Sequence, residues 1–417
     1  MTSFVLSALC AQIGAAAYDP VGVHVDAAGV LRSRTTTTDP RLAKLWAEAK
    51  KHQKDGQLLY VSLPRLFAEA RKLVDAGKPL PDEIRYLGGM TRLRYVFVYP
   101  DSRDVVIAGP AEPFDASVRY RPLGRITGRP VLHIDDVVVA IRAFGSKNPD
   151  RIGCDIEITD EIRKRISDKI TAIGPSAGVI GFKKACDEIA EAGGPQPVKF
   201  YGIDPETRFA FACVEADYRL KQLALGVLPS PVASVSSYKS MLLQPEAAHR
   251  FSLESDYEAL LVSPDGKAYE IRGPSLKVNT GLLGKPESTD KDVSTAARRF
   301  KQLCNENFEA LTKHLVEWAD LANLGDLAIL GAIVAQDKLA EKTGWDTSWV
   351  RDGFPVTKMT APKSAMTVCS YKASGRAAVF ISGGVWIRGD AARKADEGPA
   401  KEAARPEGEG WSVGKRK

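Results

Sequence analysis

Metal-binding and redox motifs are scarce in this chain. It has five histidines and six cysteines, but no Cys-x-x-Cys pair and no two histidines at metal-ligand spacing. These absences exclude a zinc knuckle and a dithiol motif. We expect the widely spaced cysteines to be small buried residues, with disulfide formation left open. Because Rossmann and P-loop glycine patterns are also missing, no cofactor is expected.

Long charged runs and long apolar runs are missing as well. The formal net charge of +6 is small for 417 residues, and no block of five or more Lys or Arg occurs, so nothing favours a nucleic-acid partner. No apolar stretch reaches the roughly 18 residues that span a bilayer, and no transmembrane span is expected. The apolar start, Met1–Ala17, lacks the basic region of a signal peptide and is more typical of a plain N-terminal helix.

The sequence that is present is typical of a globular protein with both helices and strands. Its hydrophobic share is 44% and its charged share 26%. Tyr95–Tyr99 and Asp104–Ala108 flank a turn and form the clearest hairpin. A second hairpin joins Glu258–Ser263 to Ala268–Arg272 through Asp265-Gly266. With the helical patterns between them, these hairpins predict an α+β fold of mixed, largely antiparallel hairpins packed with helices.

Two long helices and a last strand are predicted in the C-terminal half. Asp292–Val316 forms one helix, and Leu321–Ala340 is a second that is apolar on most sides and therefore buried. Ala378–Ser382 is the last strand and ends at Gly383-Gly384. The first helix carries one apolar stripe, at positions 293, 297, 300, 304, 308, 311 and 315.

Four segments are predicted along the chain. Residues 1–20 form an N-terminal segment, and residues 21–150 an α+β subdomain with the first hairpin. Residues 151–390 form a second, closely joined α+β subdomain with a buried central helix. Residues 391–417 are rich in Ala, Glu, Lys, Gly and Pro, and cannot bury enough apolar surface to offset the entropy of ordering, so we expect a disordered tail.

The most distinctive stretch is the helix that follows Asp204-Pro205, where Asp is the expected N-cap and Pro the first helical residue. At 100° per residue, its apolar side chains fall on two opposite faces. We therefore expect it to lie between two packed layers. Its charges fall on the flanks, where Glu215 precedes Arg219 and Asp217 precedes Lys221 by four residues, the favourable order for helical ion pairs.

Catalytic and metal-site candidates are few. Gly174-Pro-Ser-Ala-Gly178 matches the nucleophile-elbow pattern, but a helical segment precedes it where the motif needs a strand, so Ser176 is expected to cap the next helix. His133 and Asp135 are weak candidates for metal ligands, and a structural role is favoured for both. The remaining hypothesis is a hydrolase with an acid-dependent site near Asp217, Arg219 and Arg272.

Several blocks come in a recognisable order, among them Phe200–Thr207, Val214–Arg219 and Ala268–Gly273, and the chain closes with Ser382–Val385. From about Val21 to Val385, the chain resembles an uncharacterised bacterial family, a domain of unknown function found mainly in predicted exported proteins. The resemblance implies an exported or cell-envelope location and brings no catalytic residues with it. The leading hypothesis is a non-enzymatic structural or interaction protein, whose partners are copies of itself or other envelope proteins.

Overall fold

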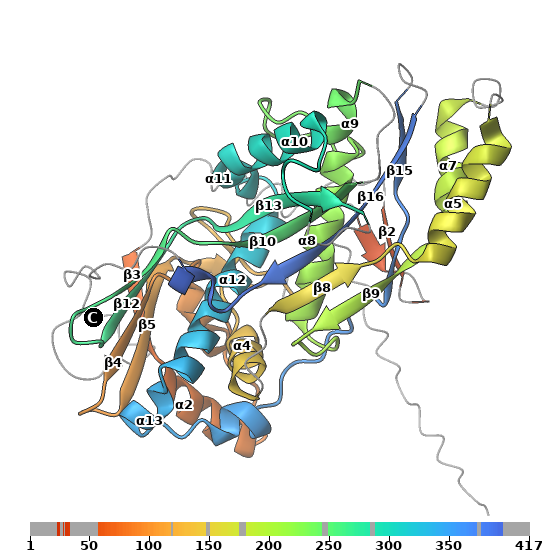
Figure 1. The fold of residues 1–417 in the computed structure, drawn as a ribbon. Coiled ribbons are helices and arrows are strands. Elements are labelled where there is room, and N and C mark those ends of the chain that lie inside the picture. Colours follow the sequence, from red (N-terminus) through yellow and green to blue (C-terminus); the bar gives the residue numbers. More distant parts are fainter. Residues whose placement is uncertain are drawn as a thin grey trace, which may run out of the picture.

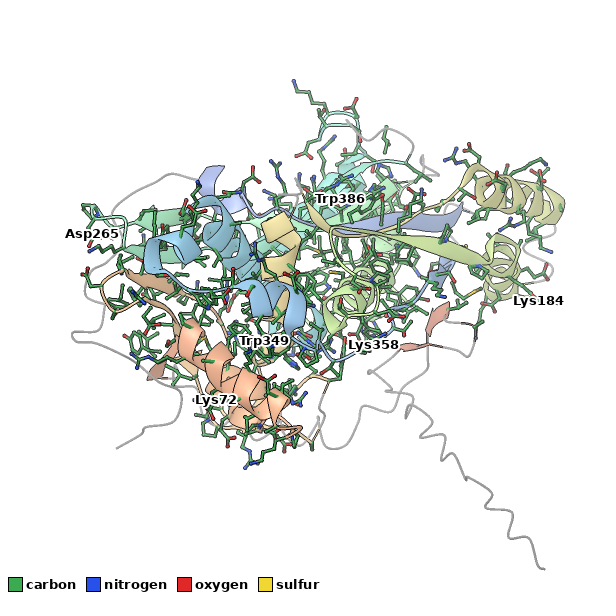
Figure 2. All side chains as sticks on the ribbon, turned by 90° about the horizontal axis from the view of Figure 1, so that it is seen from below. Lys72, Lys184, Asp265, Trp349, Lys358 and Trp386 are labelled. Carbon is green, nitrogen blue, oxygen red and sulfur yellow. The ribbon has the colours of Figure 1, made fainter. Side chains whose placement is uncertain are left out.

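The computed structural model describes residues 23–25, 28, 30–33, 57–117, 120–146, 151–174, 181–243, 249–283, 288–372 and 377–394. Within these ranges the fold has two large β-sheets, with helices between them and around them (Figure 1). This arrangement confirms the α+β prediction. Figure 2 shows Lys184 and Asp265 at opposite ends of the molecule, which is elongated along the direction that joins them.

The larger sheet has nine strands, and most neighbours in it are antiparallel. The exceptions are the parallel pairs β10–β16 and β14–β2. Near the N-terminus, β1 and β2 form an antiparallel pair. The order across the sheet is β1 (Val23–Val25), β2 (Val30–Ser33), β14 (Ser364–Met366), β9 (Pro195–Tyr201), β8 (Ile152–Ile156), β16 (Ala377–Ile387), β10 (His249–Asp256) and β13 (Ser275–Leu282), with β15 (Cys369–Lys372) on β16.

Strand β16 differs from its prediction. Instead of ending at Gly383-Gly384, it runs through both glycines to Ile387, paired with β10 on one side and β8 on the other. A Cβ atom on Gly383 would overlap the carbonyl oxygen of Phe251 and a carboxylate oxygen of Asp217. These glycines therefore permit close packing inside the sheet, a role that glycine has in strands as well as in turns.

The second sheet has five antiparallel strands and contains both predicted hairpins, which are confirmed. The hairpins pair with each other through β12 and β4, so this sheet joins segments from either side of residue 150. The proposed division into subdomains at that residue stays a prediction. The strand order is β11 (Ala259–Val262), β12 (Ala268–Arg272), β4 (Tyr95–Tyr99), β5 (Asp104–Ala111) and β3 (Gln57–Ser62).

Three helices occupy the centre: α4 (Ile134–Ser146), α8 (Arg208–Ala224) and α12 (Val316–Gln336). Helix α12 packs against both α4 and α8 (Figure 1). Its length and apolar composition would suffice to cross a membrane, and 94% of its most apolar stretch is buried inside the fold. A core helix meets the same criterion, so the feature does not decide between the two.

The helix predicted for Asp292–Val316 is broken into α10 (Thr295–Glu306), α11 (Phe308–Thr312) and the start of α12. The first break is at Asn307, whose side-chain amide donates to the carbonyl oxygen of Leu303 at 2.8 Å. The prediction of one continuous helix was therefore wrong. The predicted start of the next helix at Leu321 was also wrong, because α12 begins at Val316. The apolar stripe is nevertheless buried at all seven positions.

The remaining elements lie around this centre. Ser62 caps α2, accepting a hydrogen bond from the backbone N–H of Arg65. Residues 1–20 and 395–417, which include most of the predicted tail, lie outside the described residues. The other helices are α2 (Leu63–Asp75), α3 (Asp82–Arg85), η1 (Leu87–Gly89), α5 (Asp160–Ile173), α7 (Phe182–Gly193), α9 (Tyr238–Met241), α13 (Leu339–Thr343), η3 (Trp349–Gly353) and η5 (Ala391–Lys394), with the short strands β6 (Phe114–Asp115) and β7 (Leu123–Gly124).

Two glycine substitutions test the close packing at β16. Gly383→Ala should destabilise the fold by about 1–3 kcal/mol, because its methyl group overlaps backbone and a buried carboxylate. Gly145→Ala is the matched control: it lies in α4, where the added methyl group would make an ordinary contact with Arg351, and it should be neutral or stabilise by up to about 1 kcal/mol. Urea unfolding of the two variants measures both effects. Equal stabilities would contradict the packing role of Gly383.

Candidate functional site

Helix α8 is the element from which the candidate site is built. It begins at Arg208, and its N-cap is Thr207, whose side-chain oxygen accepts from the backbone N–H of Ala210 at 3.2 Å. The predicted start at Asp204-Pro205 was wrong, because Asp204 accepts from the backbone N–H of Glu206 at 2.8 Å and so belongs to the preceding turn. All 17 residues of α8 are buried.

The predicted position of α8 between two layers is confirmed. One side packs against β16, β10 and β8 of the larger sheet, and the other against α12 and α4. The charged residues of the helix are therefore enclosed, so each of them needs a partner inside the protein.

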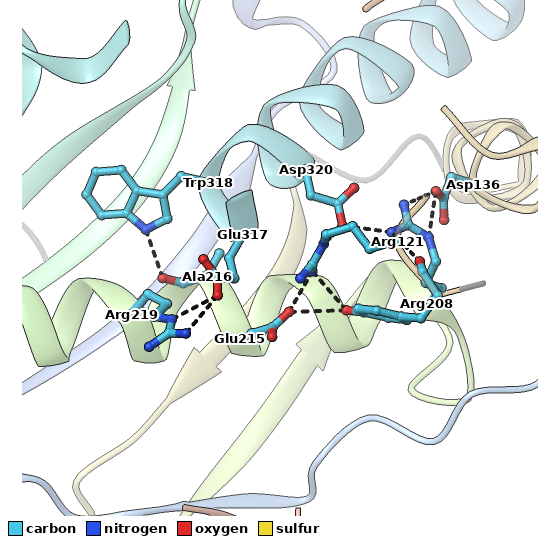
Figure 3. Close-up of polar contacts among 10 residues, drawn as sticks. Arg121, Asp136, Arg208, Glu215, Ala216, Arg219, Glu317, Trp318 and Asp320 are labelled. Carbon is cyan, nitrogen blue, oxygen red and sulfur yellow. Dashed lines mark hydrogen bonds and ion pairs between the residues drawn. The ribbon is translucent and has the colours of Figure 1, made fainter. Parts of the chain in front are cut away.

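Arg121 and Arg208 form the centre of a buried ionic network with three acids (Figure 3). Arg121 contacts Glu215 at 2.6 Å and Asp320 at 2.8 Å, and Arg208 contacts the same Asp320 oxygen at 2.8 Å. Arg208 also pairs with Asp136, with its Nε 3.0 Å from that carboxylate. All five side chains are less than a tenth exposed. The network joins α4, α8 and α12 with the segment before α4.

The acids of this network differ in their pKa values because they face different numbers of guanidinium groups. Burial acts to raise the pKa of Asp320, but Arg208 and Arg121 together outweigh it and lower that pKa to about 2. Burial raises the pKa of Asp136 to about 6, since Arg208 offsets it only in part. Asp320 is thus firmly ionised, whereas Asp136 binds a proton just below neutral pH.

The predicted helical pair of Glu215 with Arg219 is replaced by contacts to other elements. Arg219 pairs with Glu317 of α12 at 2.9 Å and donates to the side-chain oxygen of Gln222 at 3.1 Å. Glu215 accepts from Arg121, as described above. Next to this pair, the indole N–H of Trp318 donates to the carbonyl oxygen of Ala216 at 3.2 Å (Figure 3). Glu215 and Arg219 therefore form ion pairs with residues outside α8 and not with each other.

The second predicted pair, Asp217 with Lys221, is confirmed. Its nitrogen–oxygen distance is 3.0 Å, and both side chains are almost fully buried. Burial raises the pKa of Asp217, and Lys221 acts against that rise. The carboxylate lies against Gly383 of β16, on the sheet side of α8.

The three residues of the hydrolase hypothesis lie in different environments. Asp217 faces the larger sheet and Arg219 faces α12. Arg272 lies on β12 of the five-stranded sheet, where its Nε contacts Glu270 of the same strand at 3.0 Å. Asp217 and Arg219 are each joined to a partner of opposite charge in the core, and Arg272 belongs to the other sheet. The structure does not bring the three together.

His133 and Asp135 flank the start of α4 and have separate neighbours. The buried ring of His133 meets Tyr86 edge to face at 5.0 Å, and burial holds the pKa of this imidazole well below its usual value. Asp135 accepts from the backbone N–H of Thr357 at 3.3 Å. Among the described residues, no group of three or more His, Cys, Asp and Glu could hold a metal ion. Ser176 lies outside the described residues.

Sequence reasoning missed an open cleft beside the start of α8. The cleft of about 560 Å³ lies between α4, the turn before α8 and the segment 356–358. Its lining combines apolar and charged side chains, among them the exposed Lys358, which pairs with Glu206 at 3.0 Å. The lining comes from three distant segments, and the sequence analysis marked only Asp204-Pro205 among them, as a helix start. The apolar part of the lining consists of Val139, Ala143, Ile203 and Val356, with Arg142 of α4 beside them.

The chain was compared with known families and proteins. Residues 154–238 match the family described as Protein of unknown function (DUF1598). The match runs from within β8 through α5, α7, β9 and α8 to Tyr238, and so contains the buried helix on which the resemblance to an uncharacterised family partly rests. Neither the curated proteins nor the solved structures gave a match.

The shared carboxylate of Asp320 provides one test of the network. Asp320→Asn should destabilise the protein by about 3–5 kcal/mol, since it leaves two buried guanidinium groups short of an anion. The control is Asp168→Asn, which breaks an exposed pair with Lys164 and should cost less than about 1 kcal/mol. Both are measured by urea unfolding at neutral pH. A small effect of Asp320→Asn would mean that other groups compensate the buried charges of Arg121 and Arg208.

Asp136 provides a test by pH. Its pKa is about 6 in the folded state against 3.8 for an ordinary Asp, so the folded state binds the proton more tightly. Its contribution to the free energy of unfolding should therefore fall as the pH rises from about 4 to about 6, and level off above. The measurement is the difference in free energy of unfolding between the wild type and Asp136→Asn across this range. If this difference stays flat or rises with pH, the pKa of Asp136 is not raised in the folded state.

Proposed function

We propose that this protein is a non-enzymatic interaction protein. The observation that carries the proposal is that the ionisable residues of α8 are buried and paired, either with neighbouring elements or, for Asp217 and Lys221, with each other. General acid–base catalysis requires groups within hydrogen-bonding reach of a substrate, and these groups are enclosed by a sheet on one side and helices on the other. Their arrangement gives no support to the hydrolase hypothesis.

The open cleft next to α8 is suited to binding. Apolar side chains with a few polar groups are typical of ligand sites, and the lining of this cleft has both. Thr207 is the hydroxyl residue in its lining, and its oxygen is already used as the cap of α8 while its proton is donated to the carbonyl oxygen of Asp204 at 2.7 Å. The cleft thus offers contact area and charge rather than an activated nucleophile.

The location and the partners are also part of the proposal. The resemblance to a family found mainly in predicted exported proteins favours an exported or cell-envelope location. In that setting the partners would be further copies of this chain or other envelope proteins, reached through the cleft and its charged side chains. A non-enzymatic protein in this location needs a stable frame with an exposed contact surface, which the paired core and the open cleft would provide.

The proposal predicts association that depends on the charged side chains of the cleft. The full chain should self-associate in size-exclusion chromatography with light scattering, or co-sediment with an envelope fraction. Lys358→Glu, which reverses the exposed charge that pairs with Glu206, should weaken that association about tenfold. Lys164→Glu on α5 is an equally exposed control and should leave it unchanged. A strict monomer that binds no envelope fraction would contradict the proposed function.

A further inference from the structure

Two cysteines from distant parts of the sequence meet where α7 packs on the larger sheet. Cys186 lies on α7, which packs against β15, and Cys369 lies at the start of β15, where each thiol affects the pKa of the other. Figure 1 shows α7 and α5 standing beside β15 at one end of the molecule. The two sulfur atoms are therefore neighbours because of the fold, which is the condition for a disulfide between residues far apart in sequence.

The surroundings hold both thiols in place. Cys369 packs against a small apolar cluster that includes Ala185, the residue next to Cys186, together with Ile162, Ile166 and Ile189. This cluster is separate from the two large cores, and Cys369 of β15 packs against it. Cys186 is 6% exposed and Cys369 is partly exposed, so the pair lies at the margin of the cluster rather than deep inside a core.

The two thiols are not equivalent. The hydrogen bond from the Cys369 thiol lowers the pKa of Cys186, burial and Asp187 act to raise it, and Lys239 adds a further lowering. The same bond, together with burial, raises the pKa of Cys369. Lys239 is held nearby, donating to the hydroxyl of Ser370 at 2.7 Å. Cys186 is thus the better nucleophile, and Cys369 is placed to attack second.

The other described cysteines differ from this pair. Cys154, Cys213 and Cys304 are fully buried, and burial raises the pKa of each of these thiols. A thiol in such an environment is rarely ionised and is out of reach of an oxidant. These three cysteines therefore serve as internal controls.

We propose that Cys186 and Cys369 are a redox-active pair that forms a disulfide between α7 and β15. With a small disulfide such as oxidised glutathione as oxidant, the Cys186 thiolate attacks one glutathione sulfur and expels the other glutathione as its thiolate. Cys369 then loses its proton to solvent and attacks the Cys186 sulfur, which expels the second glutathione thiolate. The two protein thiols are oxidised by two electrons, and one glutathione disulfide is reduced to two glutathione molecules.

The disulfide would fix the α5–α7 pair to the sheet. In the reduced protein, the small apolar cluster packs the pair against Cys369 of β15. Because the two cysteines lie far apart in sequence, the link closes a long loop and should stabilise the folded state. This inference does not depend on the proposed function, since it concerns the chemistry of the folded chain.

The test uses the full-length protein, reduced and then incubated with oxidised glutathione. Free thiols are counted by alkylation, and the cross-linked peptides are identified by mass spectrometry. The expected product is one intramolecular disulfide joining the Cys186 and Cys369 peptides, with the other thiols still alkylated after unfolding. The oxidised form should also melt several degrees higher than the reduced form.

Two single variants and one control complete the test. Cys186→Ser and Cys369→Ser should each abolish the cross-link, and Cys369→Ser should trap glutathione on Cys186. Cys213→Ser removes a thiol from the buried set and should leave the cross-link intact. Because the wild-type peptide map needs no variant, a variant that fails to fold does not affect the test. The inference is overturned if the wild type keeps both thiols free, or if either cysteine pairs with another.

Discussion

The carboxylate of Asp320 is the contact on which the centre of the molecule depends. It accepts two guanidinium groups, from Arg121 and Arg208, in a region that is closed to solvent. A buried arginine without an anion would cost several kcal/mol, so helix α8 can be enclosed on all sides only because α12 supplies this acid. The Arg208–Asp320 pair also gives α8 and α12 a direct ionic contact, which favours one position of α12 along α8.

The two sheets share one layer of helices, and the contact at Asp320 helps to align this layer. Helices α4 and α12 each present side chains to both large apolar cores: on α12, Leu324 belongs to one core and Leu327 to the other. An ionic contact between α8 and α12 therefore also aligns the apolar faces that meet the five-stranded sheet. Strand pairing between β12 and β4 then joins the halves of the chain within that sheet. Charge pairing sets the alignment, and apolar burial supplies most of the stabilisation.

Sequence patterns predicted what depends on near neighbours along the chain. Both hairpins, the two apolar faces of α8 and the Asp217–Lys221 pair rest on local spacing, and all were found. The partners of Glu215 and Arg219 could not be predicted, because Arg121 and Glu317 lie far away in sequence and local pairing is worth only a few tenths of a kcal/mol. The break at Asn307 and the passage of β16 through Gly383-Gly384 likewise follow from tertiary contacts.

The pairing of residues that are far apart in sequence also explains why the distinctive sequence of α8 does not mark an active site. A shifted pKa often indicates catalysis, but a shift also arises wherever burial forces charges to pair, and Asp136, Glu215 and Asp217 are shifted for that reason. What separates the two cases is access to a substrate. These carboxylates are fully buried, while the cleft at Lys358 is open and the Cys186–Cys369 pair lies at the margin of the fold. Function in this chain should therefore be sought at the cleft and at that margin, and α8 is best understood as a structural helix of the core.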